Sequence, residues 1–160
     1  MSVNKHKPHV LVLPEDDADR QLATGFESEV STRQLQVLPP GRGWLAALQM
    51  FNADEAADMR RWGLNRHLVL LIDFDNDTSR LEHVKTKIPE DLRERVYIIG
   101  SLSDPQKLSS ALGMPPERIG QALATDCRND KYATWGHKLL QHNASELDRL
   151  RTQVRSILFP

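Results

Sequence analysis

The chain has 160 residues and a net charge of -1, with 39% hydrophobic and 27% charged residues, values ordinary for one globular domain. The near-neutral charge excludes a global basic field that would attract nucleic acid, although a local basic patch can still bind one. The sequence has no apolar run near the ~20 residues of a membrane span, no signal-type apolar core and a single cysteine, Cys127. We therefore expect a cytoplasmic protein without a membrane partner, an intrachain disulfide or a multi-cysteine zinc site.

Short apolar runs alternate with helical patterns over the first part of the chain. The runs predict strands at about 9–13, 34–38, 68–72 and 96–99, and the periodicities between them predict helices at about 17–30, 44–62 and 77–87. The run at 68–72 is apolar throughout, as in a central parallel strand that helices cover on both faces. The alternation predicts an α/β fold of about four parallel strands with helices on both faces.

After residue 102 the strand pattern stops and only helical patterns follow. They predict helices at 105–112, 116–124 and 133–158, the last with a break near His142 and Asn143, where Ser145 offers a fresh start. We therefore expect an α/β core at 1–102 and a helical C-terminal extension at 103–160 that packs on the same domain.

Acidic residues follow two of the predicted strands. Glu15 comes after the first run, and Asp73 and Asp75 come after the run at 68–72. Because parallel strands end at one edge of a sheet, these carboxylates should meet there, where open α/β sheets bind ligands. Asp73 and Asp75 would face the same side of an extended segment and can hold one hard cation through oxygen ligands. Glu15 could bind the same ion or act as a general base.

Two further strand ends carry residues suited to phosphate. Gly41, Arg42 and Gly43 follow the second strand, and Ser101 follows the fourth. The glycines allow the backbone to approach a phosphate, and Arg42 can pair with one. We predict that these four residues bind phosphate.

A structural interpretation of the acids competes with the functional one. Acidic residues just after strands often cap helices or lie in solvated turns, and Asp16, Asp17 and Asp77 are placed to do so. Several acids clustered at one edge cost stability through repulsion unless a cation or an arginine offsets it. We therefore favour a site for Glu15, Asp73 and Asp75 taken together.

This arrangement resembles the TOPRIM domain, which is found in bacterial primases, topoisomerases, recombination proteins and OLD-type nucleases. The family pattern is a strand that ends in Glu, often with Asp four residues later, and a second strand that ends in Asp-x-Asp. Glu15 with Asp19 keeps the first spacing, and Asp73-Phe74-Asp75 supplies the second motif. The resemblance covers about residues 8–101. It implies a catalytic role for Glu15 and Asp19, and an Mg²⁺ or Mn²⁺ site made by Asp73, Asp75 and the further acid Asp77.

The resemblance implies metal-dependent phosphodiester chemistry on DNA or RNA, performed by a small nuclease or a nuclease subunit. One departure is Asp16, which stands where the family usually has Gly. A second hypothesis is a non-catalytic TOPRIM-fold subunit with a protein partner or a second copy of the chain. A third is a phospho-receiver domain, in which Asp73 or Asp75 accepts the phosphoryl group; no fifth strand with the expected Lys-Pro is evident.

Overall fold

The computed structural model describes residues 2–160; Met1, within the core predicted at 1–102, lies outside the described residues. The strands are β1 (His9–Pro14), β2 (Leu35–Val37), β3 (Arg66–Leu71) and β4 (Val96–Ile99). The α-helices are α1 (Asp17–Ser28), α2 (Trp44–Met50), α3 (Ala56–Arg61), α4 (Arg80–Lys87), α5 (Pro105–Leu112), α6 (Pro116–Arg128) and α7 (Ala144–Leu158). Short π or 3-10 segments, η1 (Phe51–Glu55), η2 (Gly63–Asn65), η3 (Glu90–Arg95) and η4 (Gln141–Asn143), join some of them.

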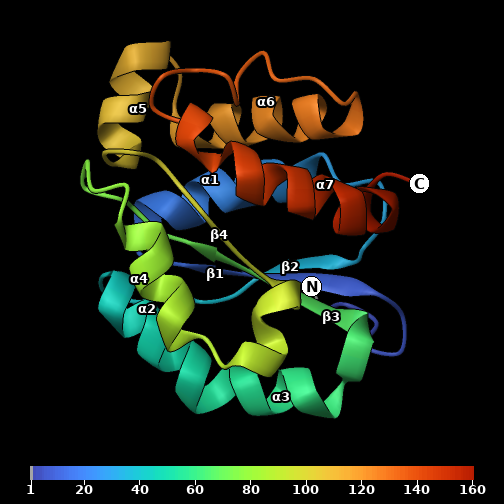
Figure 1. Cartoon of the computed structure of the whole chain (residues 1–160). Coiled ribbons are helices and arrows are strands. Elements are labelled where there is room, and N and C mark those ends of the chain that lie inside the picture. Colours follow the sequence, from blue (N-terminus) through green and yellow to red (C-terminus); the bar gives the residue numbers. More distant parts are fainter. Residues whose placement is uncertain (1) are drawn as a thin grey trace.

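The four strands form one parallel sheet in the order β2-β1-β3-β4, which confirms the predicted α/β class. Figure 1 shows the sheet as the middle of three layers, with α1, α5, α6 and α7 on one side and α2, α3 and α4 on the other. The register pairs Pro14 at the end of β1 with Leu71 at the end of β3, so both strands stop at the same level.

Side chains that alternate in direction along each strand divide the hydrophobic core between the two faces of the sheet. Val10 and Val12 of β1 pack under α1, α6 and α7, whereas Leu11 and Leu13 pack on the layer of α2, α3 and α4. Because both faces are buried, the strands read as continuous apolar runs. The C-terminal helices α6 and α7 thus cover, together with α1, one face of the sheet that the N-terminal part forms.

Two helix predictions need correction. The helix expected at 44–62 is interrupted by the π segment η1, which divides it into α2 and α3. The helix expected from residue 133 does not begin until Ala144. A buried carboxylate, that of Asp126, accepts hydrogen bonds from the backbone of Thr134 (2.7 Å) and Trp135 (3.3 Å), so this segment satisfies its backbone groups without a helix.

The loop after β3 also differs from the prediction. The helix expected from residue 77 begins at Arg80, because Asp75 and Asn76 both have left-handed backbone angles, φ 49° and 61°, which end the extended segment. Asp77 then accepts a hydrogen bond from the Ser79 amide at 3.0 Å and closes a turn. The capping interpretation is confirmed for Asp16, the N-cap of α1, whose side chain accepts from the Asp19 amide at 3.0 Å.

The outer edge of β4 is sealed by the start of α7 and the turn before it. Asn143 accepts from the Gly100 amide (3.1 Å) and donates to its carbonyl (3.0 Å), and Glu146 accepts from the Ile98 amide (3.1 Å). Both side chains are almost fully buried. In residues 2–160, none of the helices combines the length and apolar character needed to cross a bilayer.

Candidate functional site

The candidate site lies where β1 and β3 end side by side. From β1 the chain turns outward to β2, and it then crosses back over β1 to reach β3. Connections that diverge in this way leave a crevice at the carboxyl ends of the two strands, the usual ligand position in open α/β sheets. Glu15 follows β1 directly and Asp73 follows β3, so the topology places both at this crevice.

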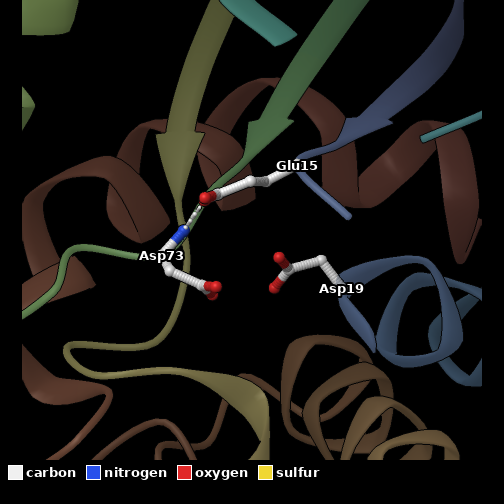
Figure 2. Close-up of side chains that lie close together, drawn as sticks. All are labelled: Glu15, Asp19 and Asp73. Atoms are coloured by element: carbon white, nitrogen blue, oxygen red, sulfur yellow. Dashed lines mark hydrogen bonds between the residues drawn. The ribbon is translucent and has the colours of Figure 1, made fainter. Parts of the chain in front are cut away.

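Three carboxylates meet there: Glu15, Asp19 and Asp73, each with an oxygen within 4.8 Å of the others. Figure 2 shows Asp19 reaching from the first turn of α1 toward Asp73, with the two carboxyl groups facing each other. Glu15 Oε2 accepts a hydrogen bond from the Asp73 backbone amide at 2.5 Å, which ties the ends of β1 and β3 together. The capping of α1 by Asp16 fixes the turn that carries Asp19.

All three acids are buried, and burial raises the pKa of each. Asp19 is only 1% exposed, and desolvation, followed by repulsion from Asp73 and Asp16, raises its pKa to about 11. Desolvation and the neighbouring Glu15 raise the pKa of Asp73 to about 8. The pKa of Glu15 is raised by desolvation, an effect that its hydrogen bond from the Asp73 amide opposes. The free site therefore favours protonated carboxyls, and bound positive charge would replace those protons.

The hydrogen bonding of the cluster is incomplete. Asp19 Oδ2 and Asp73 Oδ1 are buried and have no hydrogen-bond partner among residues 2–160. A buried polar atom without a partner costs about 1–3 kcal/mol, so this pair of acids needs either a proton shared between the two carboxyls or a bound cation in its place. A set of carboxylate oxygens suits a hard divalent cation such as Mg²⁺ or Mn²⁺. The residues present thus fit a cation.

The structure groups the predicted acids differently from the sequence analysis. Asp19, predicted as a catalytic partner of Glu15, faces Asp73, whereas Asp75 and Asp77 are exposed and outside the three-carboxylate cluster. The expectation that Asp73 and Asp75 face the same side assumed an extended segment, and the φ of 49° at Asp75 breaks it. Asp75 instead forms an ion pair with Arg80 at 2.7 Å. Metal binding by Asp75 and Asp77 stays a prediction.

The predicted phosphate-binding residues also lie at this edge of the sheet. The Gly41 amide donates to the Pro14 carbonyl at 3.0 Å, and the Gly43 amide donates to the Glu15 carbonyl at 3.2 Å. Gly43 has φ 107°, a conformation that L side chains rarely adopt. Arg42 is exposed between the two glycines. The loop therefore runs directly beside Glu15 with its cationic side chain toward solvent.

Ser101 is the least accessible of these four. Its side chain is buried, and its hydroxyl lies 3.4 Å from the Asp104 carbonyl, to which it donates. The Ser101 carbonyl accepts from the Phe74 amide at 3.0 Å. Ser101 thus aligns the loop after β4 with the loop after β3. Phosphate binding by Ser101 stays a prediction.

Sequence reasoning missed Arg80 and Trp44. Arg80 Nη1 donates to the Asp73 carbonyl at 2.9 Å, and its guanidinium lies 4.7 Å from the centre of the Trp44 ring. Trp44, the first residue of α2, is only half-buried and follows Gly43 directly. The available signal was an arginine five residues after Asp75, a distance that a turn and the start of a helix bridge.

Comparison with protein-family models, with curated protein sequences and with solved structures gave no significant match for this chain.

Proposed function

We propose that this protein catalyses Mg²⁺- or Mn²⁺-dependent hydrolysis of phosphodiester bonds in nucleic acid, as a nuclease or the nuclease subunit of an assembly. The observation that carries the proposal is the buried trio of Glu15, Asp19 and Asp73, in which one oxygen of Asp19 and one of Asp73 lack partners among residues 2–160. Such a trio is unfavourable for stability by itself, which supports a ligand of positive charge.

Each carboxylate has a distinct part in this proposal. Asp19 and Asp73 hold the cation between the start of α1 and the end of β3, and Glu15 lies close enough to contribute an oxygen. When bound, the cation polarises the phosphate and lowers the pKa of a bound water. Glu15, whose pKa is raised by burial, holds or transfers the proton at its carboxyl group. The hydrogen bond to the Asp73 amide fixes its orientation.

The TOPRIM resemblance supports the same chemistry from an independent direction. The family pattern Glu15-x-x-x-Asp19 joins two acids whose side chains lie in one cluster with Asp73. The receiver alternative receives less support, because the sheet in residues 2–160 has four strands and no fifth to carry the Lys-Pro of that family.

The first experiment measures Mn²⁺ binding by calorimetry, together with cleavage of labelled DNA and RNA in Mg²⁺ or Mn²⁺. We expect the wild-type protein to bind and cleave, and Asp73→Asn to lose both, with cleavage reduced at least about 100-fold. Asp17→Asn is the control, since Asp17 is an exposed acid of α1 outside the carboxylate cluster, paired with Arg20 at 2.6 Å. Absence of Mn²⁺ binding by folded wild-type protein would contradict the proposal, as would undiminished cleavage by Asp73→Asn.

A further inference from the structure

We propose that Arg80 binds a phosphate group of the nucleic-acid strand, exchanging its contact with Asp75 for the phosphate oxygens. This inference rests on the proposed function, and it names the group that would hold the substrate beside the carboxylate cluster. Four observations carry it: the anchoring of Arg80, its stacking, its spare donors and the weakness of its partner.

Arg80 is anchored directly on the candidate site. Its Nη1 atom donates to the backbone carbonyl of Asp73 at 2.9 Å. Desolvation raises the pKa of the nearby Glu15 carboxyl, and the Arg80 charge opposes that rise only slightly. The guanidinium is therefore beside the buried acids but outside their cluster. A phosphate that reaches a cation held by Asp73 would pass within reach of this side chain.

Trp44 holds the guanidinium in a fixed orientation. The Arg80 group lies over the indole ring at 4.7 Å, a distance at which the cation is attracted to the ring face. Trp44 begins α2 directly after Gly43, whose amide donates to the Glu15 carbonyl. The stacking surface and the carboxylates thus belong to one rigid edge, and an arginine held in this way loses little freedom when it binds a phosphate.

The guanidinium keeps donors for a ligand. Both of its hydrogen bonds within residues 2–160, to the Asp73 carbonyl and to Asp75 Oδ2, come from Nη1. Nε and Nη2 therefore form no hydrogen bond with the described part of the protein, and a guanidinium binds phosphate best through two parallel N–H groups. The Arg80 side chain is 13% exposed, so it is accessible from solvent.

Asp75 is a weak and replaceable partner. Its side chain is 61% exposed, and ion pairs in such settings contribute little to stability. Asp75 and the adjacent Asn76 both adopt left-handed angles, 49° and 61°, which non-glycine residues rarely adopt in succession. Asp75 therefore contacts Arg80 in the free protein without holding it strongly. A phosphate that accepts two hydrogen bonds from the guanidinium would displace Asp75.

The test measures binding of a short 5′-fluorescein-labelled oligothymidylate by fluorescence anisotropy, in Ca²⁺ and separately in EDTA. We expect Arg80→Ala to weaken binding about tenfold and Arg80→Lys to recover part of it, because lysine keeps the charge but loses the paired donors. Asp75→Asn should tighten binding in EDTA by several-fold, since it frees the guanidinium. In the Arg80→Ala background, Asp75→Asn should have almost no effect.

Asp77→Asn is the matched control for Asp75→Asn. It removes the same charge from the same exposed loop, but the Asp77 carboxylate accepts from Ser79 and forms no hydrogen bond or ion pair with the Arg80 guanidinium. If Arg80 only braced the loop, Asp75→Asn and Arg80→Ala would weaken binding alike, and the inference would be overturned. It would also be overturned if Asp75→Asn and Asp77→Asn acted equally.

The two proposals can fail separately. Binding that is unchanged in Arg80→Ala, together with Mn²⁺ binding that depends on Asp73, would overturn the role of Arg80 and leave the metal-dependent function in place. Absence of oligonucleotide binding by wild-type protein in both buffers would overturn both the Arg80 assignment and nucleic acid as substrate. If Arg80→Ala does not fold, as judged by circular dichroism, the comparison of Asp75→Asn with Asp77→Asn decides the inference.

Discussion

Asp19 shows how a single buried carboxyl links stability to ligand binding. It is almost completely buried and faces another acid, and its Oδ2 atom has no hydrogen-bond partner in the described chain. The pKa of Asp19 is raised to about 11, mainly through desolvation. Because the folded protein holds this proton more tightly than the unfolded chain, stability is present at low pH and is lost as the pH rises through the raised pKa.

We predict that Asp19→Asn stabilises the protein in EDTA at neutral and alkaline pH. An amide has the same shape as the protonated acid and does not ionise, so the cost of keeping a proton on Asp19 disappears. The gain in the free energy of unfolding should be about 1–2 kcal/mol, measured by thermal unfolding between about pH 6 and about pH 9.

The control for this prediction is Asp17→Asn. The exposed carboxylate of Asp17 has a lowered pKa, first through its hydrogen bond from Arg20, so its loss should not stabilise the protein. A decrease in the melting temperature of Asp19→Asn throughout the pH range would contradict the argument. It would mean that the carboxyl supplies a native contact that the amide cannot replace.

At the residue scale, the sequence allowed part of the site to be predicted. Glu15 and Asp73 follow apolar strands, so the rule for parallel sheets placed them together. Only the family pattern predicted Asp19 as a site residue. The ion pair between Asp75 and Arg80 was missed, because it depends on a left-handed angle at Asp75 that no local sequence signal in an Asp-Phe-Asp-Asn run specifies.

Close packing between α1 and α6 illustrates the element scale. The two helices approach through glycines: a Cβ on Gly120 would lie 2.0 Å from the Leu22 carbonyl oxygen, and one on Gly25 would lie 1.9 Å from that of Glu117. A methyl group at either position would force the backbones apart. Figure 1 shows α6 lying above α1 on the outer side of this layer.

We predict that Gly120→Ala destabilises the protein by about 2–4 kcal/mol in denaturant unfolding, through overpacking. Helix propensity alone predicts the opposite sign, since alanine exceeds glycine by about 1 kcal/mol in a helix interior. Ala122→Gly in the same helix is the control, and it should cost only that propensity difference. Stabilisation by Gly120→Ala would show that the helices can separate without loss.

Element types were predictable from the sequence more often than element ends. The four strands were each located, because apolar runs between helical periodicities are a strong signal. The π segment within residues 44–62 was not foreseen, since it preserves a helical pattern. The absence of helix at 133–140 depends on Asp126, a buried acid that binds the backbone of Thr134 and Trp135, and such a tertiary contact has no local signature.

Across the whole molecule, groups with shifted pKa values set opposing limits on stability. Burial lowers the pKa of His67 to about 4, so its contribution is lost as the pH falls from the ordinary histidine range toward that value. Asp73 and Asp19, whose pKa values are raised, reduce stability as the pH rises. Above about pH 7 the histidine no longer titrates, and the raised pKa values of the two acids continue to lower stability as the pH rises.

We predict that Mg²⁺ raises the melting temperature, and that the rise is larger at about pH 9 than at about pH 7. A cation competes with protons for the same oxygens, and it stabilises by about 2.7 kcal/mol at a concentration one hundred times its dissociation constant. Thermal unfolding with Mg²⁺ or EDTA at each pH measures this, and Asp73→Asn is the control that should show no rise. An equal rise in that variant would indicate binding elsewhere.

The seal on β4 has a consequence for synthesis on the ribosome. Asn143 follows its partner Gly100 by 43 residues, and Glu146 follows Ile98 by 48. While the chain emerges, the sheet can assemble before these side chains arrive, so the nascent protein passes through a stage with an open strand edge. During that interval the edge can pair with another chain, and expression at a slower or cooler pace, or with a chaperone that shields the edge, should favour the soluble product.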